Sequence, residues 1–508
     1  MGKIAAIQKS NRNHNSGGVS PDLITIVNTL CIAIERCKKQ VSEQINLDKL
    51  ICAFLLLWLN NKLTMITSVD DIPDIKRVSG NKECMENRVR IIRENNISWV
   101  EYALLYHTKL ETSYHWQPVP ELLNNFYLMV FNKFYGNLLN KHEKNALLKI
   151  IIEPWKTPQA FKYKQRVSKN RFYSYIPTMV KQDPYLSLTS KSILLATEQL
   201  HHKSACAYQQ ERSDHICRHI FDFQNQQLLL IQQTLNKLEI TLPYLQRENK
   251  RPDYLCDNSR IPTFIREQTE TTHSYRERHS ALFGSSRALS RDDIRQFFAH
   301  LHQELKNIKG KASNIRSYRE YYNFYTYVLA FEFLLLTGCR PTHAISIEIQ
   351  CNYDFKQVIV KDKGRFRSLY LCDYLKKRIE SYRTLQQTLL TQLGLSQGSS
   401  YLWFLVDDNN HIVHLRAKSI RQFMQSHWPK NTMKSKNKVV PYCLRHTFAQ
   451  TAASSMHPKL TNQQIDLLMG HSNFGEHLGC AQRFPASRNV IENYLNQLPE
   501  YFFLSLEL

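Results

Sequence analysis

The spacing of the apolar residues constrains the fold of this chain most strongly. Near the start, apolar side chains recur every three or four positions, as in Leu23, Ile26, Val27, Leu30 and Ile34. This spacing is typical of a helix with one buried face. Similar patterns predict helices at about 47–62, 93–110, 120–152 and 187–240. Only 14 glycines occur in 508 residues, which argues against a large all-β architecture. The N-terminal half is therefore predicted to be mostly α.

The C-terminal part mixes helical patterns with short β-prone runs. Ser290 is expected to be an N-cap, with Asp293 in the capping-box position. One helix should extend through Leu305, and another, over about 313–337, should end at Gly338. Short β-prone runs then occur at 345–349, 358–360 and 367–371, and helices are predicted at about 373–392, 416–427, 442–456, 462–469 and 487–498. The predicted fold class is mainly α with a small antiparallel β-sheet (α+β).

The charge balance points to a polyanionic partner. Lys and Arg number 67 against 44 Asp and Glu, which gives a formal net charge of +23. Such a surplus attracts nucleic acid most commonly, although a merely basic protein or an anionic membrane surface would also account for it. Residues 156–175 interleave cations with aromatic side chains. They would contact phosphates and bases, or else form a solvated basic loop whose rings pack on the core.

Other features narrow the cellular setting. The longest apolar run, Ile51 to Leu59, covers about half of a bilayer span. The polar N-terminus does not resemble a signal peptide, so a cytoplasmic protein is expected. The 12 cysteines show no framework spacing and are expected to be reduced. A group of His and Cys between 201 and 219 matches no familiar zinc pattern and reads better as polar or helical surface.

Four short segments could carry chemistry. In chain order they are Leu336-Thr337-Gly338-Cys339-Arg340, Val360-Lys361-Asp362-Lys363-Gly364-Arg365, Tyr442-Cys443-Leu444-Arg445-His446-Thr447-Phe448-Ala449 and Leu468-Met469-Gly470-His471. Each segment is common by itself, and the order and intervals make the pattern. Lys363 lies 23 positions after Arg340, and His471 lies 26 positions after Arg445. Over about residues 315–480 the chain resembles the tyrosine recombinase, or phage integrase, family.

The resemblance implies a role for each motif residue in breaking a DNA phosphodiester. Arg340 and Arg445 would fork donors onto the phosphate oxygens. Lys363 would protonate the departing 5′ oxygen, and His471 would share proton handling or bind the phosphate. An attacking tyrosine would leave a 3′-phosphotyrosyl link. Neither a metal nor any other cofactor is implied.

Each of these residues also has a purely structural interpretation. Arg340 could offset the dipole of the helix before it. Lys363 could be a solvated turn lysine, with Lys361 as the competing choice. Arg445 could pair with a buried carboxylate, and His471 could be a satisfied core histidine.

The chain departs from the family pattern at two places. Tyr442 stands where the family usually has histidine, and it can still donate a hydrogen bond to phosphate. The usual position of the attacking tyrosine, about nine residues after the last histidine, is Cys480. The preferred candidate is Tyr494 on the helix predicted over 487–498, although its apolar neighbours on one face would equally suit a core tyrosine. Tyr501 is the second candidate.

The family resemblance implies a site-specific recombinase or integrase of a mobile element that cuts and rejoins double-stranded DNA. It further implies self-association, usually as a tetramer on paired sites, and no membrane contact. The expected divisions are a flexible tail (1–20), a helical N-terminal domain (21–150), a helical DNA-binding region and linker (151–285) and a catalytic domain (286–508). The alternatives are a DNA-binding protein of the same fold that has lost cleavage, and a type IB topoisomerase.

Overall fold

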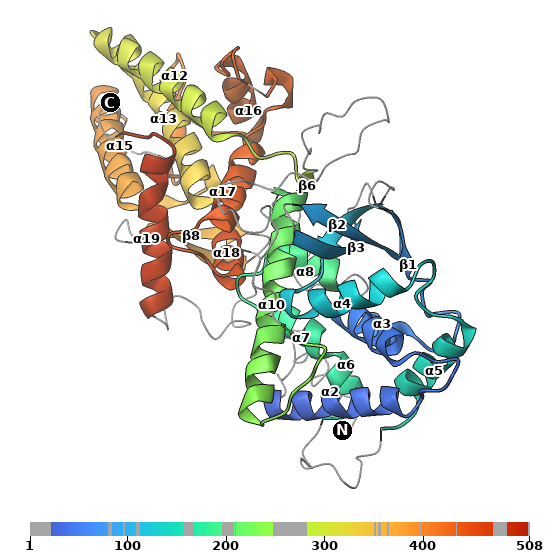
Figure 1. Ribbon diagram of the computed structural model, residues 1–508. Coiled ribbons are helices and arrows are strands. Elements are labelled where there is room, and N and C mark those ends of the chain that lie inside the picture. Colours follow the sequence, from blue (N-terminus) through green and yellow to red (C-terminus); the bar gives the residue numbers. More distant parts are fainter. Residues whose placement is uncertain are drawn as a thin grey trace, which may run out of the picture. The chain divides into compact units, whose positions relative to one another are not determined.

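The chain forms two compact units, described here from a computed structural model (Figure 1). Unit 1 consists of Met1–His201 and Glu211–Phe283, and unit 2 consists of His202–Gln210 and Gly284–Leu508. The structure describes residues 22–79, 84–94, 97–107, 112–155, 167–195, 208, 210–246, 282–349, 352–353, 357–362, 365–395, 399–432, 434–470 and 485–505.

Unit 1 combines helices with a four-stranded sheet (Figure 1). Its strands are β1 (Lys76–Arg77), β2 (Arg88–Glu94), β3 (Ile97–His107) and β4 (Thr112–Pro118), paired in the order β1-β2-β3-β4. The β1–β2 pair is parallel and the other two pairs are antiparallel. Its helices are α2 (Leu23–Lys38), α3 (Leu47–Leu59), η1 (Leu63–Met65), α4 (Glu121–Lys133), α5 (Lys141–Ile152), α6 (Lys169–Tyr173), α7 (Tyr175–Gln182), α8 (Leu188–Leu195) and α10 (Ser213–Lys237).

Helix α3 lies at the centre of the unit 1 core. Every residue from Leu50 to Leu59 is buried, so the helix is covered on all sides. The indole of Trp58 stacks on Phe172 with ring centroids 4.7 Å apart and donates to the Phe172 carbonyl oxygen at 3.0 Å. A helix that is apolar all round folds only when it is enclosed by other elements, and α2, α4 and α5 pack against it.

The helix predicted over 93–110 is wrong, because that segment forms β3. Tyr102, Leu104 and Tyr106 are buried, while the two residues between them are only partly buried. This is the two-residue period of a strand, and β-branched and aromatic residues favour that conformation. The predicted helices at 120–152 and 187–240 are also interrupted, the first between α4 and α5.

Unit 2 consists of helices with small antiparallel sheets, as the sequence predicts (Figure 1). Its helices are α12 (Arg291–Gly310), α13 (Ile315–Thr337), α14 (Pro341–Ala344), α15 (Asp373–Gln392), α16 (Ala417–Ser426), η3 (Lys436–Lys438), α17 (Tyr442–Ser454), α18 (Asn462–Met469) and α19 (Pro485–Tyr501). Strands β7 (Asn352–Tyr353), β8 (Gln357–Asp362) and β9 (Arg365–Tyr370) form a sheet in that order. Strands β10 (Phe404–Val406) and β11 (Ile412–His414) pair with each other. Strands β5 (Gln210–Arg212) and β6 (Leu282–Gly284), most of whose residues belong to unit 1, form a further pair.

Two details of unit 2 test the sequence predictions. Ser290 is the N-cap of α12, and its hydroxyl accepts from the Asp293 amide at 3.0 Å, as predicted. The strand predicted at 345–349 is wrong. Ile345 continues the α14 turn in a helical conformation, and Glu348 forms an isolated bridge to Tyr401. The proline at the first position of α14 favours that turn.

A buried charge network joins α12, α13 and α15. Glu332 of α13 is completely buried. Its carboxylate accepts from Arg378 Nε at 3.1 Å, from the Tyr374 hydroxyl at 3.0 Å and from His302 Nε2 at 2.8 Å. Burial would raise the pKa of Glu332, but the nearby Arg378 and His302 outweigh burial and lower it. The network therefore holds an ionised carboxylate in the core of unit 2.

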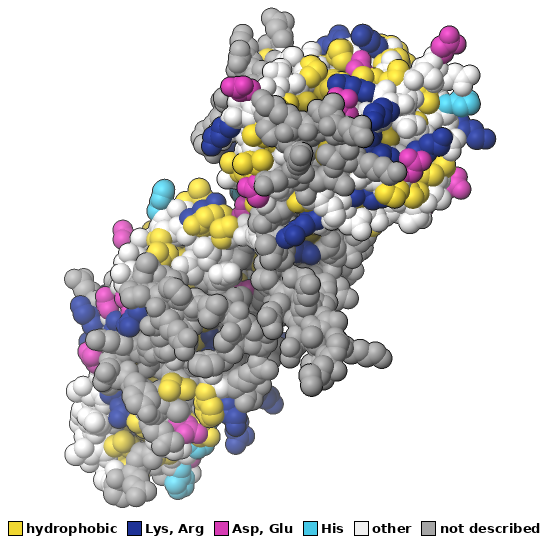
Figure 2. Space-filling model, turned by 90° about the horizontal axis from the view of Figure 1, so that it is seen from below, with side chains coloured by type: hydrophobic (Ala, Val, Ile, Leu, Met, Phe, Trp, Pro, Cys, Tyr) yellow, Lys and Arg dark blue, Asp and Glu magenta, His cyan; other side chains and the backbone are white. Residues whose placement is uncertain are grey.

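The described side chains on the face drawn in Figure 2 do not gather into one basic patch. Lys and Arg side chains are dispersed there among hydrophobic and neutral ones. In the parts of the chain that the structure describes, no helix is both long enough and apolar enough to cross a bilayer.

Candidate active site

The turn after α13 presents the first motif. Helix α13 ends at Gly338, whose φ of +61° is a conformation that residues with a side chain rarely adopt. A Cβ at this position would overlap the ring of Phe448 on α17. Arg340 follows as the N-cap of α14 and is partly exposed. The glycine thus lets the first motif approach the third one closely.

Gly338→Ala is expected to lower the free energy of unfolding by roughly 2–4 kcal/mol. The positive φ contributes roughly 1–2 kcal/mol, and the clash with Phe448 adds about as much. Gly394→Ala is the matched control, because Gly394 has a φ of +67° but open space where its Cβ would lie. Denaturant unfolding of both variants gives the difference. Equal losses would show that the approach to Phe448 is not tight.

Arg445 connects three of the four motif segments. It is completely buried on α17. Its Nη1 donates to the carbonyl oxygen of Gly338, 107 positions earlier, and its Nη2 donates to that of Met469 at 2.7 Å. One guanidinium therefore holds the turn before Arg340 and the end of α18 together.

A second arginine supports the end of α18. Arg367 of β9 donates from Nη1 to the carbonyl oxygen of Leu468 at 3.0 Å. The helix ends at Gly470, with a φ of +65°, where an added Cβ would come within 2.5 Å of Arg367 Nε. The last carbonyls of a helix lack partners within it, and here two arginines supply donors for them.

Two tyrosine hydroxyls meet beside the arginines. Tyr442, the first residue of α17, shares a short hydrogen bond with the hydroxyl of Tyr208. The Tyr208 ring covers the Arg445 guanidinium, with 4.9 Å from Cζ to the ring centroid, and lies 4.7 Å from the His446 ring. Tyr208 belongs to unit 2, although it lies 234 positions before Tyr442. Tyr208 was not predicted from the sequence, because it belongs to none of the four motif segments.

The pKa values of Tyr208 and Tyr442 are shifted in opposite directions. Burial would raise the pKa of Tyr208, but the hydrogen bond with Tyr442 and the charges of Arg445 and Arg340 outweigh burial and lower it. Burial raises the pKa of Tyr442, and the hydrogen bond to Tyr208 raises it further. Of the two hydroxyls, that of Tyr208 therefore loses its proton more easily.

His446 makes a neutral contact in the same place. Its Nδ1 lies 3.1 Å from the Ser285 hydroxyl. Burial, followed by the charge of Arg287, lowers the pKa of His446 to about 4. At neutral pH it is an uncharged ring that packs beside Tyr208.

Tyr494 is buried in the core of unit 2. It is 3% exposed on α19 and contacts the Phe448 ring at 6.2 Å between centroids. Its hydroxyl has no hydrogen-bond partner among the described residues, and burial raises its pKa well above the usual value. Tyr501, the second candidate, is 40% exposed, and its ring lies 4.5 Å from the Arg291 guanidinium.

Two other predicted site residues, Lys363 and His471, lie outside the described residues. The strands that flank Lys363 are described, and they form an antiparallel hairpin, with Asp362 paired to Arg365. Lys361, the competing choice, lies on β8 with its ammonium 5.9 Å from the Phe366 ring centroid. The structure thus brings Arg340, Tyr442 and Arg445 together, and it describes the segments that lead to the other two.

The third motif lies within a long segment that contains no acidic residue, called here the acid-free segment. Between Asp408 and Asp466 the sequence contains no Asp or Glu but nine Lys and Arg. Six of these are exposed and form no ion pair with a described residue: Arg416, Lys418, Arg421, Lys430, Lys436 and Lys438. A count of charged residues in windows along the chain could have found this segment. Exposed cations that are not neutralised by a described carboxylate are available to a polyanion.

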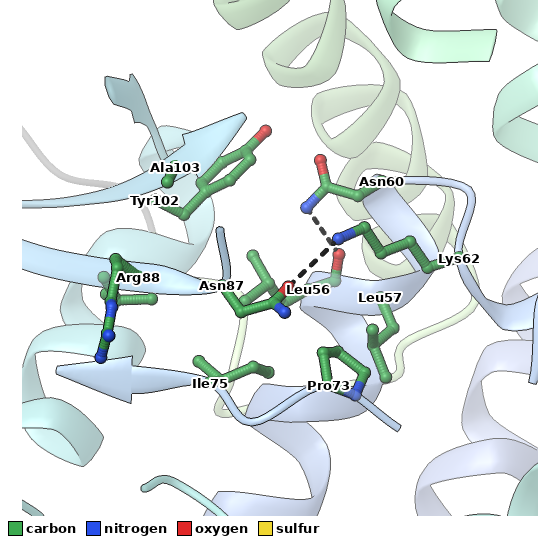
Figure 3. A pocket seen from close by; sticks show the side chains of 11 residues that line it. Leu56, Leu57, Asn60, Lys62, Pro73, Ile75, Asn87, Arg88, Tyr102 and Ala103 are labelled. Carbon is green, nitrogen blue, oxygen red and sulfur yellow. Dashed lines mark hydrogen bonds between the residues drawn. The ribbon is translucent and has the colours of Figure 1, made fainter. Parts of the chain in front are cut away.

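Unit 1 contains a separate pocket around a buried amine (Figure 3). Lys62 Nζ donates to Asn87 Oδ1 at 3.4 Å, and Leu56, Leu57 and Tyr102 are among the lining residues. Burial lowers the pKa of Lys62. Within the described residues, no group of three or more His, Cys, Asp and Glu side chains is arranged to hold a metal ion. Neither feature adds to the chemistry of unit 2.

Comparisons with known proteins give only distant matches. No family model matches the chain, and no curated protein matches it. Matching solved structures include XerA recombinase, at 17% identity over 55% of this chain and 74% of that one, with a TM-score of 0.25. XerH site-specific recombinase bound to its difH substrate matches in the pre-cleavage complex at 14% identity over 57% of this chain and 64% of that one. XerH bound to palindromic difH in the post-cleavage complex matches at 15% over 64% and 82%. Both also have a TM-score of 0.25, which is too low to assign a function.

Proposed function

We propose that this chain is a tyrosine-type site-specific recombinase that cuts and rejoins double-stranded DNA for a mobile element. The observation that carries the proposal is the double contact of Arg445. A single buried guanidinium holds the turn before Arg340 and the end of α18 before His471. Residues that are far apart in the sequence and that match one family's motifs in order are thereby joined in one place.

The chemistry of these groups suits a phosphodiester. Cleavage places extra negative charge on a five-coordinate phosphorus, and fixed cations stabilise that state. Arg340 is partly exposed at a helix N-terminus and would bind the phosphate oxygens, with Tyr442 donating a further hydrogen bond. Lys363 would protonate the departing 5′ oxygen, and His471 would assist. The exposed cations of the acid-free segment would contact the phosphate backbone on either side.

The proposed reaction conserves the bond energy in a 3′-phosphotyrosyl link. Tyr494 is the attacking residue that the family resemblance implies, and its use would require α19 to move, since its hydroxyl is buried. Assembly as a tetramer on paired sites and a cytoplasmic location are part of the same proposal.

Covalent trapping tests this function. The protein is incubated with a nicked duplex carrying the ends of its element, so that cleavage releases a short fragment and strands the adduct. We expect a covalent protein–DNA product on a denaturing gel, without added metal. Arg340→Ala should reduce its yield about 10²-fold or more, while duplex binding changes little because many other cations remain. Lys376→Ala, at a partly exposed cation on α15, is the control and should leave the yield unchanged.

The second candidate function is a DNA-binding protein that has lost cleavage. The observation in its favour is Tyr494, whose hydroxyl lies in the core without a described partner. Tight, salt-dependent duplex binding with no adduct on a verified attachment site would favour this second function over the first.

A further inference from the structure

Cys480 stands where the family usually has its attacking tyrosine, and the position of Tyr208 indicates which residue could attack instead. We propose, on the basis of the recombinase function above, that Tyr208 rather than Tyr494 supplies the hydroxyl that attacks the DNA phosphate. The ring of Tyr208 lies against the guanidinium of Arg445, and its hydroxyl contacts the hydroxyl of Tyr442. Both neighbours belong to the third motif.

The geometry places the Tyr208 oxygen among the groups that would bind a phosphate. Its hydroxyl bonds directly to that of Tyr442, and its ring lies 4.9 Å from the Arg445 guanidinium. Tyr442 and Arg340 are partly exposed, whereas Tyr208 is only 8% exposed, so a ligand would reach Tyr442 and Arg340 first. A nucleophile must lie within reach of the cations that stabilise the charge it creates. Tyr208 meets this condition, whereas the described contacts of Tyr494 are with core residues.

The electrostatic setting favours the phenolate of Tyr208. The Tyr442 hydrogen bond, Arg445 and Arg340 all lower the pKa of Tyr208 and outweigh its burial. The pKa of Tyr442 is raised. Tyr442 therefore stays protonated when Tyr208 ionises, and its hydroxyl can then donate a hydrogen bond to the phenolate oxygen. Hydroxyl nucleophiles are weak at their ordinary pKa and need such activation. Burial raises the pKa of Tyr494, which has the opposite effect.

The reaction balances without a further reagent. Tyr208 loses its proton to solvent before attack, and Tyr442 stabilises the phenolate. The phenolate oxygen forms a bond to phosphorus as the bond from phosphorus to the 5′ oxygen breaks. That oxygen leaves with the bonding electron pair and takes a proton from the general acid of the proposed recombinase, an ammonium group. The products are a 3′-phosphotyrosine at Tyr208 and a free 5′ hydroxyl, and rejoining reverses each step.

Peptide mapping of the trapped adduct tests the proposal directly. The full chain is trapped on the nicked duplex and digested, and the peptide that carries the nucleotide is sequenced by mass spectrometry. We expect the adduct on the peptide that contains Tyr208. Tyr208→Phe should lower adduct yield at least about 10³-fold, with less than about a threefold change in duplex Kd, because the ring over Arg445 is kept. Tyr135→Phe, at a tyrosine of unit 1 that is 78% exposed, is the control and should retain the parent yield.

A second measurement separates a chemical role from packing. In a near-ultraviolet pH titration of the parent, one tyrosine should ionise at lower pH than the others, and Tyr208→Phe should lack that step. An adduct on Tyr494 or Tyr501 would overturn the assignment while leaving the recombinase function in place. An adduct on no residue, with a verified attachment site, would overturn both.

Discussion

Arg378→Ala is expected to lower the free energy of unfolding of unit 2 by about 3–5 kcal/mol, the usual loss when one partner of a buried ion pair is removed. Arg378 donates two hydrogen bonds to Glu332, and both side chains are almost completely buried. Among the described residues, the substitution leaves His302 and Tyr374 as the remaining partners of this buried carboxylate. Chemical denaturation at neutral pH measures the loss.

Lys376→Ala on the same helix is the control for Arg378. Lys376 pairs with Asp373 at 2.7 Å, but both side chains are partly exposed. Surface pairs contribute about 0–1 kcal/mol, so the control should cost no more than that. Similar losses in the two variants would mean that the buried network contributes little beyond its exposed counterpart.

The loss at Arg378 should also depend on pH in a defined direction. In the parent, the folded state lowers the pKa of Glu332. The stability that Glu332 contributes is therefore complete above its unfolded pKa of about 4.3 and is lost as pH falls through the folded value. Without Arg378, burial should raise the pKa of Glu332 instead. The difference in free energy of unfolding between parent and variant should therefore become smaller as the pH falls.

Sequence patterns predicted unit 2 better than unit 1, for a physical reason. Helices α15 and α18 begin and end where predicted, because their apolar spacing is regular and turn residues flank them. In unit 1, the segment that forms β3 has apolar residues at nearly every position, and a short run of this kind fits either period. Its pairing with β2 and β4 decides the outcome, and local sequence does not report that pairing.

In the candidate site too, features set by neighbouring residues could be predicted from the sequence, and contacts between distant residues could not. Gly338 was predicted from a local helix-end pattern, and its positive φ confirms that pattern. The contact between Tyr208 and Tyr442 spans 234 positions and belongs to no motif, so only the fold reveals it. Glu332 and its partners were missed similarly, since they come from three different helices.

Arg445→Ala is expected to affect both fold and activity. The substitution removes donors from the carbonyl oxygens of Gly338 and Met469 and leaves a cavity under Tyr208. Unsatisfied buried polar groups cost about 1–3 kcal/mol each, so the free energy of unfolding should fall by roughly 3–5 kcal/mol. Arg316→Ala, which removes an exposed arginine of α13 that pairs loosely with Glu320, should change it by less than about 0.5 kcal/mol.

Arg445→Lys distinguishes the two roles of this residue. Lysine keeps the charge but lacks the planar fork that reaches both carbonyls, so the turn before Arg340 and the end of α18 should lose their common tie. We expect adduct yield to fall about 10²-fold or more even under conditions where circular dichroism shows the variant folded. If Arg445→Lys instead kept the parent yield, positive charge at this position would suffice, and the double contact would not be what organises the site. If Arg445→Ala kept both stability and yield, neither the double contact nor the guanidinium would matter, and the proposed site would have to lie elsewhere.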